Sequence, residues 1–168
     1  YAEMTIAATE KLKKLMYYVS QSVPVKINYS DMERDLDIPR NSLPTYLEYL
    51  EKAELVSMLR MKANGDAVLR KMDKLYLNNS NMMYSMSDHE PNPGNVRETM
   101  FLSWMKNAFD VVESPISDFE LDGKTFEVGG RKKGKKQIAD ASEGYIVADD
   151  IEYAYKSKIP LWMFGFIY

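Results

Sequence analysis

The chain has 168 residues and a formal charge of −3, from 22 basic and 25 acidic residues. Its 45% hydrophobic and 28% charged residues exclude wholesale disorder and a fibrous protein, and its lack of cysteine excludes disulfides and cysteine-ligated zinc. Since no apolar run reaches the ~20 residues of a membrane span and no leader-like segment opens the chain, we expect a cytoplasmic protein without a membrane partner.

The first part of the chain predicts helices. Apolar residues at helical spacing predict a helix that begins near Ile6 and ends before Pro24. Ser30 and Glu33 have the spacing of a capping box, in which each side chain bonds the other residue's backbone N–H. This box predicts a short second helix over residues 31–36.

A third helix and two strands are predicted next. Leucines and a tyrosine repeat every three to four residues over 43–50 and predict a helix. Apolar strand-like segments follow at 55–61 and 69–77, separated by a turn at 64–66. Helices joined by a turn and followed by a hairpin have the order of a winged helix. We therefore expect a winged-helix module over residues 1–90.

A polar, turn-rich stretch at 78–95 contains the boundary between two modules. The second part of the chain, residues 91–168, is predicted to form a smaller α+β module. The pattern predicts a helix at 96–109, strands at 117–121, 125–128 and 145–148, and a closing apolar segment at 161–166. The expected fold class is therefore α+β, with a helical winged-helix module followed by this αβ module.

Two acids flank the expected hairpin of the second module. A turn between Asp118 and Glu127 can bring both carboxylates to one edge of a sheet, and Glu98 on the preceding helix could supply a third. Paired hard oxygen ligands suit Mg²⁺ or Mn²⁺, which can activate water. A nearby lysine would stabilise developing negative charge. The alternative is a solvated edge with surface salt bridges, which contribute little stability.

A basic run follows the second acid. Residues 122–136 have a local charge of +4, and Lys132, Lys135 and Lys136 are candidates for contacts with nucleic-acid phosphates. The alternative is a solvated loop that leads into a helix.

The predicted hairpin of the first module also carries basic residues. Arg70 and Lys71 are candidates for contacts with a DNA backbone. Glu48 and Glu51 lie on the helix that would read the DNA, where they would repel phosphates. This module could therefore contact the DNA backbone or another protein, but it is not expected to read base sequence.

Five segments in a fixed order lead to a family resemblance. They are KLYLNN at 74–79, GNVRE at 94–98, DF at 118–119, FEVGGRKKGKKQI at 126–138 and IPLWMFG at 159–165. Together they resemble the uncharacterised C-terminal domain of predicted AAA+ ATPases from bacteria and archaea. The resemblance extends from about residue 10 onward, and it rests on the order and spacing of the segments.

The resemblance implies a winged helix followed by a restriction-endonuclease-like module of the PD-(D/E)xK type. It places the acids of the nuclease motif at Asp118 and Glu127, which would hold Mg²⁺ or Mn²⁺, with Glu98 assisting. The motif lysine would fall at Gly129, so Lys133 or Arg131 would have to take its role from the following turn. The resemblance also implies a helix after this turn.

The resemblance further implies an upstream ATPase domain in the same polypeptide, which would be a partner of this chain and would hold ATP. Gly123-Lys124-Thr125 is not a phosphate-binding loop, because the required earlier glycine is replaced by Asp118. The first residue, a tyrosine instead of methionine, also suggests a fragment of a longer protein.

The expected function is therefore that of the C-terminal part of an AAA+ ATPase. It would bind DNA or another partner and carry a metal-dependent nuclease site whose motif is degenerate at Gly129. The alternative is a non-enzymatic module for protein interaction and assembly. The sequence does not indicate the substrate or the oligomeric state.

Overall fold

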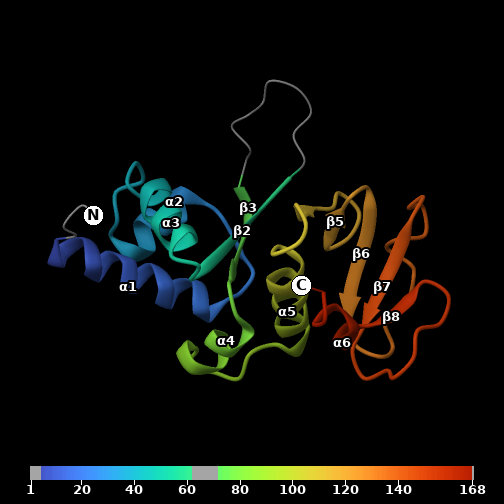
Figure 1. Ribbon diagram of the computed structural model, residues 1–168. Coiled ribbons are helices and arrows are strands. Elements are labelled where there is room, and N and C mark those ends of the chain that lie inside the picture. Colours follow the sequence, from blue (N-terminus) through green and yellow to red (C-terminus); the bar gives the residue numbers. More distant parts are fainter. Residues whose placement is uncertain (1–4, 62–71, 168) are drawn as a thin grey trace. The chain divides into compact units, whose positions relative to one another are not determined.

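The computed structural model describes residues 5–61 and 72–167. This part of the chain contains six helices and two β-sheets, so the expected α+β class is confirmed (Figure 1). The chain divides into two compact units. The first comprises Tyr1–Met58 and Lys74–Pro91, and the second comprises Leu59–Asp73 and Asn92–Tyr168.

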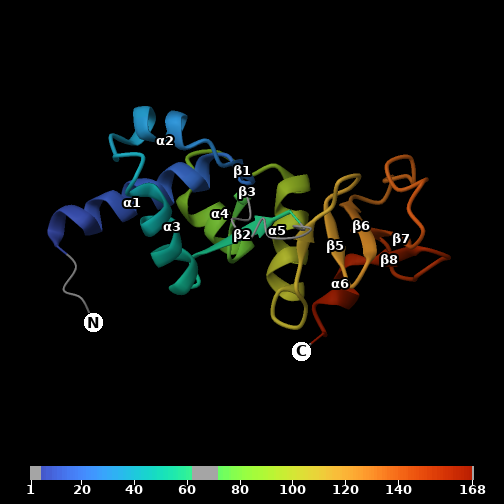
Figure 2. The ribbon, with the colours of Figure 1, turned by 90° about the horizontal axis from the view of Figure 1, so that it is seen from above.

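Up to residue 91, helices precede and follow a small sheet. The elements are α1 (Ile6–Gln21), β1 (Val25–Lys26), α2 (Tyr29–Leu36), α3 (Leu43–Lys52), β2 (Val56–Arg60), β3 (Met72–Leu77) and α4 (Ser80–Met86). The strand order is β1-β3-β2, and Val25 of β1 lies opposite Leu75 of the antiparallel β3. α1 contacts both α2 and α4 (Figure 2).

The core of the first unit follows the apolar spacing of its helices. Leu15 and Val19 of α1 are buried, as are three leucines of α3 at positions 43, 47 and 50. The helices expected from Ile6 and from residue 43 are thus confirmed. Ile6 itself is 85% exposed, because the first turns of α1 extend beyond the core.

The start of α2 differs from the expected capping box. Asn28 caps the helix, since its side-chain oxygen accepts hydrogen bonds from the backbone N–H of Ser30 at 3.1 Å and of Asp31 at 3.4 Å. Glu33 does not reach back, because its Oε1 accepts from the backbone N–H of Arg40 at 2.9 Å. The helix therefore begins at Tyr29, earlier than the sequence predicts.

Two elements of this region were not predicted. β1 has two residues, which is too short to show a strand period. α4 falls in the stretch expected to be turn-rich, because its serine and asparagine residues mask its helical character. It begins after Asn79, whose side chain accepts from the backbone N–H of Asn81 at 2.8 Å. The turn expected at 64–66 and the first residues of the strand expected at 69–77 lie outside the described residues.

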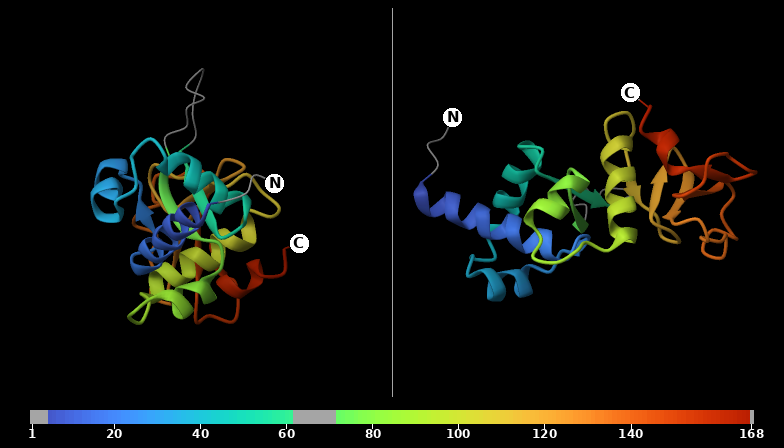
Figure 3. Two further views of the ribbon diagram at one scale, coloured as in Figure 1. Left: turned by 90° about the vertical axis from the view of Figure 1, so that its left-hand side faces the viewer. Right: turned by 90° about the horizontal axis from the view of Figure 1, so that it is seen from below.

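The second unit is built around a five-stranded sheet. Its elements are α5 (Pro93–Met105), β4 (Val112–Glu113), β5 (Phe119–Leu121), β6 (Lys124–Gly129), β7 (Gly144–Ala148), β8 (Lys158–Pro160) and α6 (Leu161–Phe164). The strand order is β4-β5-β6-β7-β8. Figure 3 shows α5 in yellow beside the orange strands of this sheet. β4 to β6 form an antiparallel meander, and β7 and β8 continue it in parallel to β6.

Aromatic side chains form the core between the helices and one face of this sheet. The ring of Phe101 on α5 lies 5.3 Å from that of Phe119, 5.6 Å from that of Phe126 and 5.0 Å from that of Phe164 on α6. Because side chains alternate along a strand, the neighbour of Phe126, Glu127, points to the opposite face.

The opposite face carries the polar residues. Glu127 on β6 lies level with Ile146 on β7, which lies level with Lys158 on β8. Segment 130–143 connects β6 to β7 through turns, and Ile138 within it packs with Ile146. The helix that the resemblance implies after the basic run is therefore absent from this fully described segment.

The position of the α2 cap can be tested directly. Asn28→Ala removes an N-cap and should lower the free energy of unfolding by about 1 kcal/mol. Ser30→Ala, which alters the capping residue expected from the sequence, should leave stability nearly unchanged. Urea unfolding of both variants measures this difference, and the reverse order of effects would contradict the observed cap.

Candidate functional site

A fully buried carboxylate is the centre of the candidate site in the second unit. Glu127 has an exposed fraction of 0%. Its Oε2 accepts a hydrogen bond from Ser117 Oγ at 2.7 Å, and its Oε1 forms an ion pair with Lys133 Nζ. Both carboxylate oxygens thus have a polar partner in the interior of a small unit.

Lys133 reaches this carboxylate from the turn that follows β6. Its backbone N–H donates to the carbonyl of Gly130 at 2.9 Å, which forms the turn. Its side chain then folds back toward Glu127 and remains 31% exposed. The sequence analysis named Lys133 and Arg131 as residues that could take the role of the motif lysine. Of these two, Lys133 forms the ion pair with Glu127.

The electrostatic surroundings favour the charged form of Lys133. Burial alone would lower the pKa of the amine, but the hydrogen bond and the charge of Glu127 outweigh this effect. The negative charges of Asp118 and Glu98 act in the same direction, so that the pKa of Lys133 is raised. The site therefore holds a protonated amine among three acids.

Gly129 explains how a lysine four residues away can occupy this place. A Cβ atom at position 129 would lie 2.7 Å from Cδ of Lys133, 2.9 Å from its Cγ and 3.0 Å from its Cβ. Real Cβ atoms essentially never come closer than 3.0 Å to another atom. The stem of Lys133 thus fills the space that any side chain at 129 would need.

Asp118 is fixed beside Glu127 by the β5–β6 hairpin. Phe119 pairs with Phe126, so the antiparallel register places the preceding residue, Asp118, level with Glu127. Oδ2 of Asp118 accepts from the backbone N–H of Val128 at 2.8 Å. The hairpin expected from the sequence therefore brings both acids to one place on the sheet.

The structure places the other candidate residues less centrally. Lys132, Lys135 and Lys136 are exposed on the segment that carries Lys133. Arg70 and Lys71 lie outside the described residues. On α3, Glu51 accepts from the backbone N–H of Met58 at 3.2 Å, so this acid has a structural contact.

Three side chains that form contacts in or near the site were not predicted from the sequence. Ser117 holds Glu127, and Arg97 on α5 forms an ion pair of 2.8 Å with Asp149, which follows β7. Lys158 donates to the turn that carries Lys133. The sequence gives no signal for these contacts, because they depend on loop conformation and on β8, a strand of three residues.

The donor atoms determine which metal could bind. Among the described residues, no group of three or more His, Cys, Asp or Glu side chains could hold a metal ion. Mg²⁺ commonly binds one or two carboxylates and keeps water or substrate phosphates as its other ligands. The carboxylates of Asp118 and Glu127 are ligands of this type, and such an ion would share the oxygens of Glu127 with Ser117 and Lys133.

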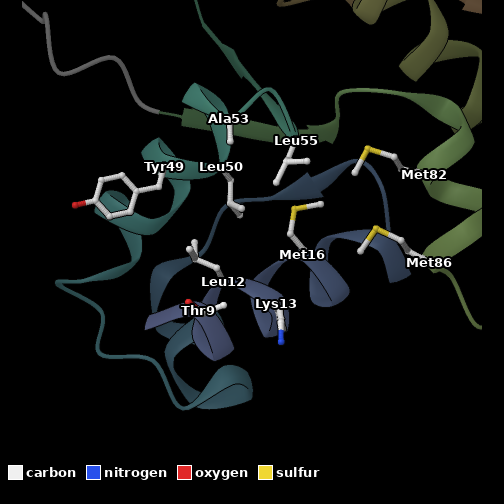
Figure 4. A pocket seen from close by; sticks show the side chains of 10 residues that line it. All are labelled: Thr9, Leu12, Lys13, Met16, Tyr49, Leu50, Ala53, Leu55, Met82 and Met86. Atoms are coloured by element: carbon white, nitrogen blue, oxygen red, sulfur yellow. The ribbon is translucent and has the colours of Figure 1, made fainter. Parts of the chain in front are cut away.

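The first unit contains an apolar pocket of about 410 Å³ (Figure 4). Its lining side chains come from α1, α3, the start of β2 and α4, and they are Thr9, Leu12, Lys13, Met16, Tyr49, Leu50, Ala53, Leu55, Met82 and Met86.

No described helix is long and apolar enough to cross a membrane.

The comparisons with known proteins identify a family but no activity. The model of a domain of unknown function, DUF8612, matches residues 2–92, and the chain belongs to this family. No curated protein matches the chain, and no solved structure matches it. The resemblance to the C-terminal domain of AAA+ ATPases therefore stays a prediction.

The packing of Lys133 over Gly129 predicts the effect of adding one methyl group. Gly129→Ala should lower the free energy of unfolding by about 1–3 kcal/mol, because the new Cβ would collide with the lysine stem. Gly134→Ala is the matched control, since its Cβ would meet nothing within 4 Å. Thermal unfolding measures both, and equal stability of the two variants would contradict the packing.

Proposed function

We propose that the second unit is a restriction-endonuclease-like module that cleaves phosphodiester bonds with Mg²⁺ or Mn²⁺. The observation that carries this proposal is the ion pair between Lys133 and the buried Glu127, beside Asp118. Two acids and a lysine are the groups that such a reaction needs. Lys133 would supply the amine that the motif has at position 129, where this chain has glycine.

The topology of the second unit supports the same proposal. An antiparallel meander, β4 to β6, is followed by strands parallel to β6, and α5 precedes the meander. A helix packed with a mixed sheet in this way supports the αβ module that the family resemblance implies. The connection from β6 to β7 departs from it, because this segment has turns where a helix is implied.

Each residue of the site has a chemical role in this proposal. Asp118 and Glu127 would hold the metal ion through hard carboxylate oxygens. When bound, the ion supplies activation of water and stabilisation of negative charge. Lys133 places a positive charge at Nζ, where it can stabilise the charge that develops on a phosphate. Glu98 helps to keep this amine protonated.

We further propose that residues 1–90 form a winged helix that contacts the sugar-phosphate backbone of a nucleic acid. The element order α1-β1-α2-α3-β2-β3 and the strand order β1-β3-β2 support this assignment. Glu48 on α3 forms an ion pair with Lys52, and Glu51 bonds the chain at Met58, so α3 offers little to base edges. Lys132, Lys135 and Lys136 would add phosphate contacts from the second unit.

The biological setting rests on the resemblance alone. We propose that this chain is the C-terminal part of an AAA+ ATPase, whose upstream domain would bind ATP and move these modules. The partner of the chain would then be that ATPase domain, with DNA as the substrate of the combined protein.

A second candidate is a non-enzymatic module for protein interaction. The apolar pocket of the first unit favours it, because pockets of a few hundred Å³ lined by apolar side chains commonly accept a ligand or an anchor side chain. Three of its lining residues are methionines, which adapt to different partners. In this case the acids and Lys133 would serve only to hold the second unit together.

Metal binding and cleavage test the nuclease proposal. Mn²⁺ titrated into the chain by calorimetry should bind saturably, and Asp118→Asn and Glu127→Gln should each weaken binding by at least about tenfold. Asp122→Asn, a change in the exposed hairpin turn, is the matched control and should bind as the wild type does. Lys133→Met should lower cleavage of DNA by about 100-fold or more. No Mn²⁺ binding by the wild type would reject the proposal.

Salt dependence separates nucleic-acid binding from protein interaction. The affinity of the chain for DNA should fall steeply with salt, and changing Lys132, Lys135 and Lys136 together to alanine should reduce the log–log slope by about 3. Lys156→Ala is the control for loss of an exposed lysine elsewhere. Fluorescence anisotropy at several salt concentrations measures the slope. DNA binding that ignores salt would contradict the phosphate contacts and favour the second candidate.

A further inference from the structure

One lysine side chain of the second unit bonds the backbone of the turn that carries Lys133. Lys158 is the first residue of β8, and it is partly buried. Its Nζ donates to the carbonyl of Arg131 at 2.6 Å and to the carbonyl of Lys133 at 3.1 Å. A single ammonium group thus binds the backbone on both sides of Lys132.

The register of the sheet explains how Lys158 reaches this turn. Glu127, Ile146 and Lys158 lie level with one another on β6, β7 and β8, so their side chains share one face. Two strand spacings separate the first from the third, about 10 Å. Glu127 and Lys158 therefore lie on the strands to either side of Ile146, and the turn that carries Lys133 contacts the side chains of both.

Two features of the sequence work against a single conformation of this turn. It lies in the run Arg131 to Lys136, which contains five basic side chains that repel one another. Gly130 and Gly134 flank its centre, and glycine has more backbone freedom than other residues. Hydrogen bonds from a charged donor to two carbonyls oppose both effects.

Lys133 can pair with Glu127 only while this turn is folded back. The lysine comes from outside the strand, so its backbone position is set by the turn and not by the sheet ladder. A small displacement of the turn would take Nζ away from the buried carboxylate. The groups that fix the turn therefore fix the charged atom of the site.

We propose that Lys158 is a positioning residue, which holds the Arg131–Lys133 turn so that the amine of Lys133 stays on Glu127. The functional meaning of this placement rests on the nuclease function proposed above. The placement itself does not, and it can be measured without any activity. The competing explanation is that Lys158 only satisfies two carbonyls and leaves Lys133 unaffected.

Selective acylation of lysine amines tests the placement. The wild type, Lys158→Met and Lys158→Arg are treated briefly with acetic anhydride, and mass spectrometry gives the rate at Lys133 relative to exposed Lys135. Lys158→Met keeps an apolar stem but removes the donor of both hydrogen bonds, so the relative rate should rise by about tenfold or more, as expected for the loss of charged hydrogen bonds. Lys158→Arg should restore the slow rate.

A matched control excludes a general effect of losing a lysine near β8. Lys156 is exposed and lies over the ring of Tyr155, with 5.2 Å from Nζ to the ring centroid. Lys156→Met should leave the acylation of Lys133 unchanged. An unchanged rate at Lys133 in folded Lys158→Met would overturn the proposal, as would an equal rise in Lys156→Met.

A second measurement needs no variant and applies even if Lys158→Met fails to fold. In protein labelled with ¹⁵N-lysine and ¹³C, the ammonium of Lys158 should show couplings across hydrogen bonds to the carbonyl carbons of Arg131 and Lys133. The absence of both couplings, with the Lys158 ammonium signal visible, would overturn the proposal.

Cleavage assays then separate this proposal from the nuclease function. If the wild type cleaves DNA, Lys158→Met should lower kcat by about tenfold with KM little changed, because only the placement of Lys133 is altered. If the wild type does not cleave, the nuclease function fails, and the acylation result still decides whether Lys158 places Lys133.

Discussion

Burial of the Glu127 carboxylate is the constraint on which the polar part of the second unit depends. Removing a carboxylate from water costs several kcal/mol unless a counter-charge and hydrogen bonds accompany it. Here Ser117 donates to one oxygen and Lys133 pairs with the other. Gly129 leaves the space for the lysine stem, and Lys158 bonds the turn from which this stem starts. These features form one connected arrangement around a single charge.

Such an arrangement is a poor way to stabilise a small unit. Replacing a buried ion pair by apolar residues of similar volume is often neutral or stabilising, so stability alone does not account for it. The same face of the sheet carries Ile146, which packs with Ile138 and shows that apolar packing is available there. A lysine whose pKa is raised by neighbouring acids, one of them buried, marks a candidate functional site. This reasoning, together with Asp118, favours the nuclease proposal over a purely structural role.

Periodicity predicted the elements that are long enough to show it. The helices α1, α3 and α5 were predicted in this way. The turn expected between Asp118 and Glu127 predicted the β5–β6 hairpin, which brings these two acids together. β1 and β8 are too short for a period, and the polar residues of α4 resemble a turn. The sequence has glycine at position 129, where the motif has its lysine. The structure shows that the glycine makes room for Lys133, a relation that depends on the turn and is invisible in spacing alone.

A crystal structure of this chain grown with Mn²⁺, with anomalous data collected near the manganese edge, tests the central claim most directly. The account predicts one anomalous peak in contact with carboxylate oxygens of Asp118 and Glu127. It also predicts that Nζ of Lys133 lies beside this site and that the lysine stem packs over Gly129. A structure in which Lys133 extends into solvent, with no anomalous peak at the two acids, would contradict the account.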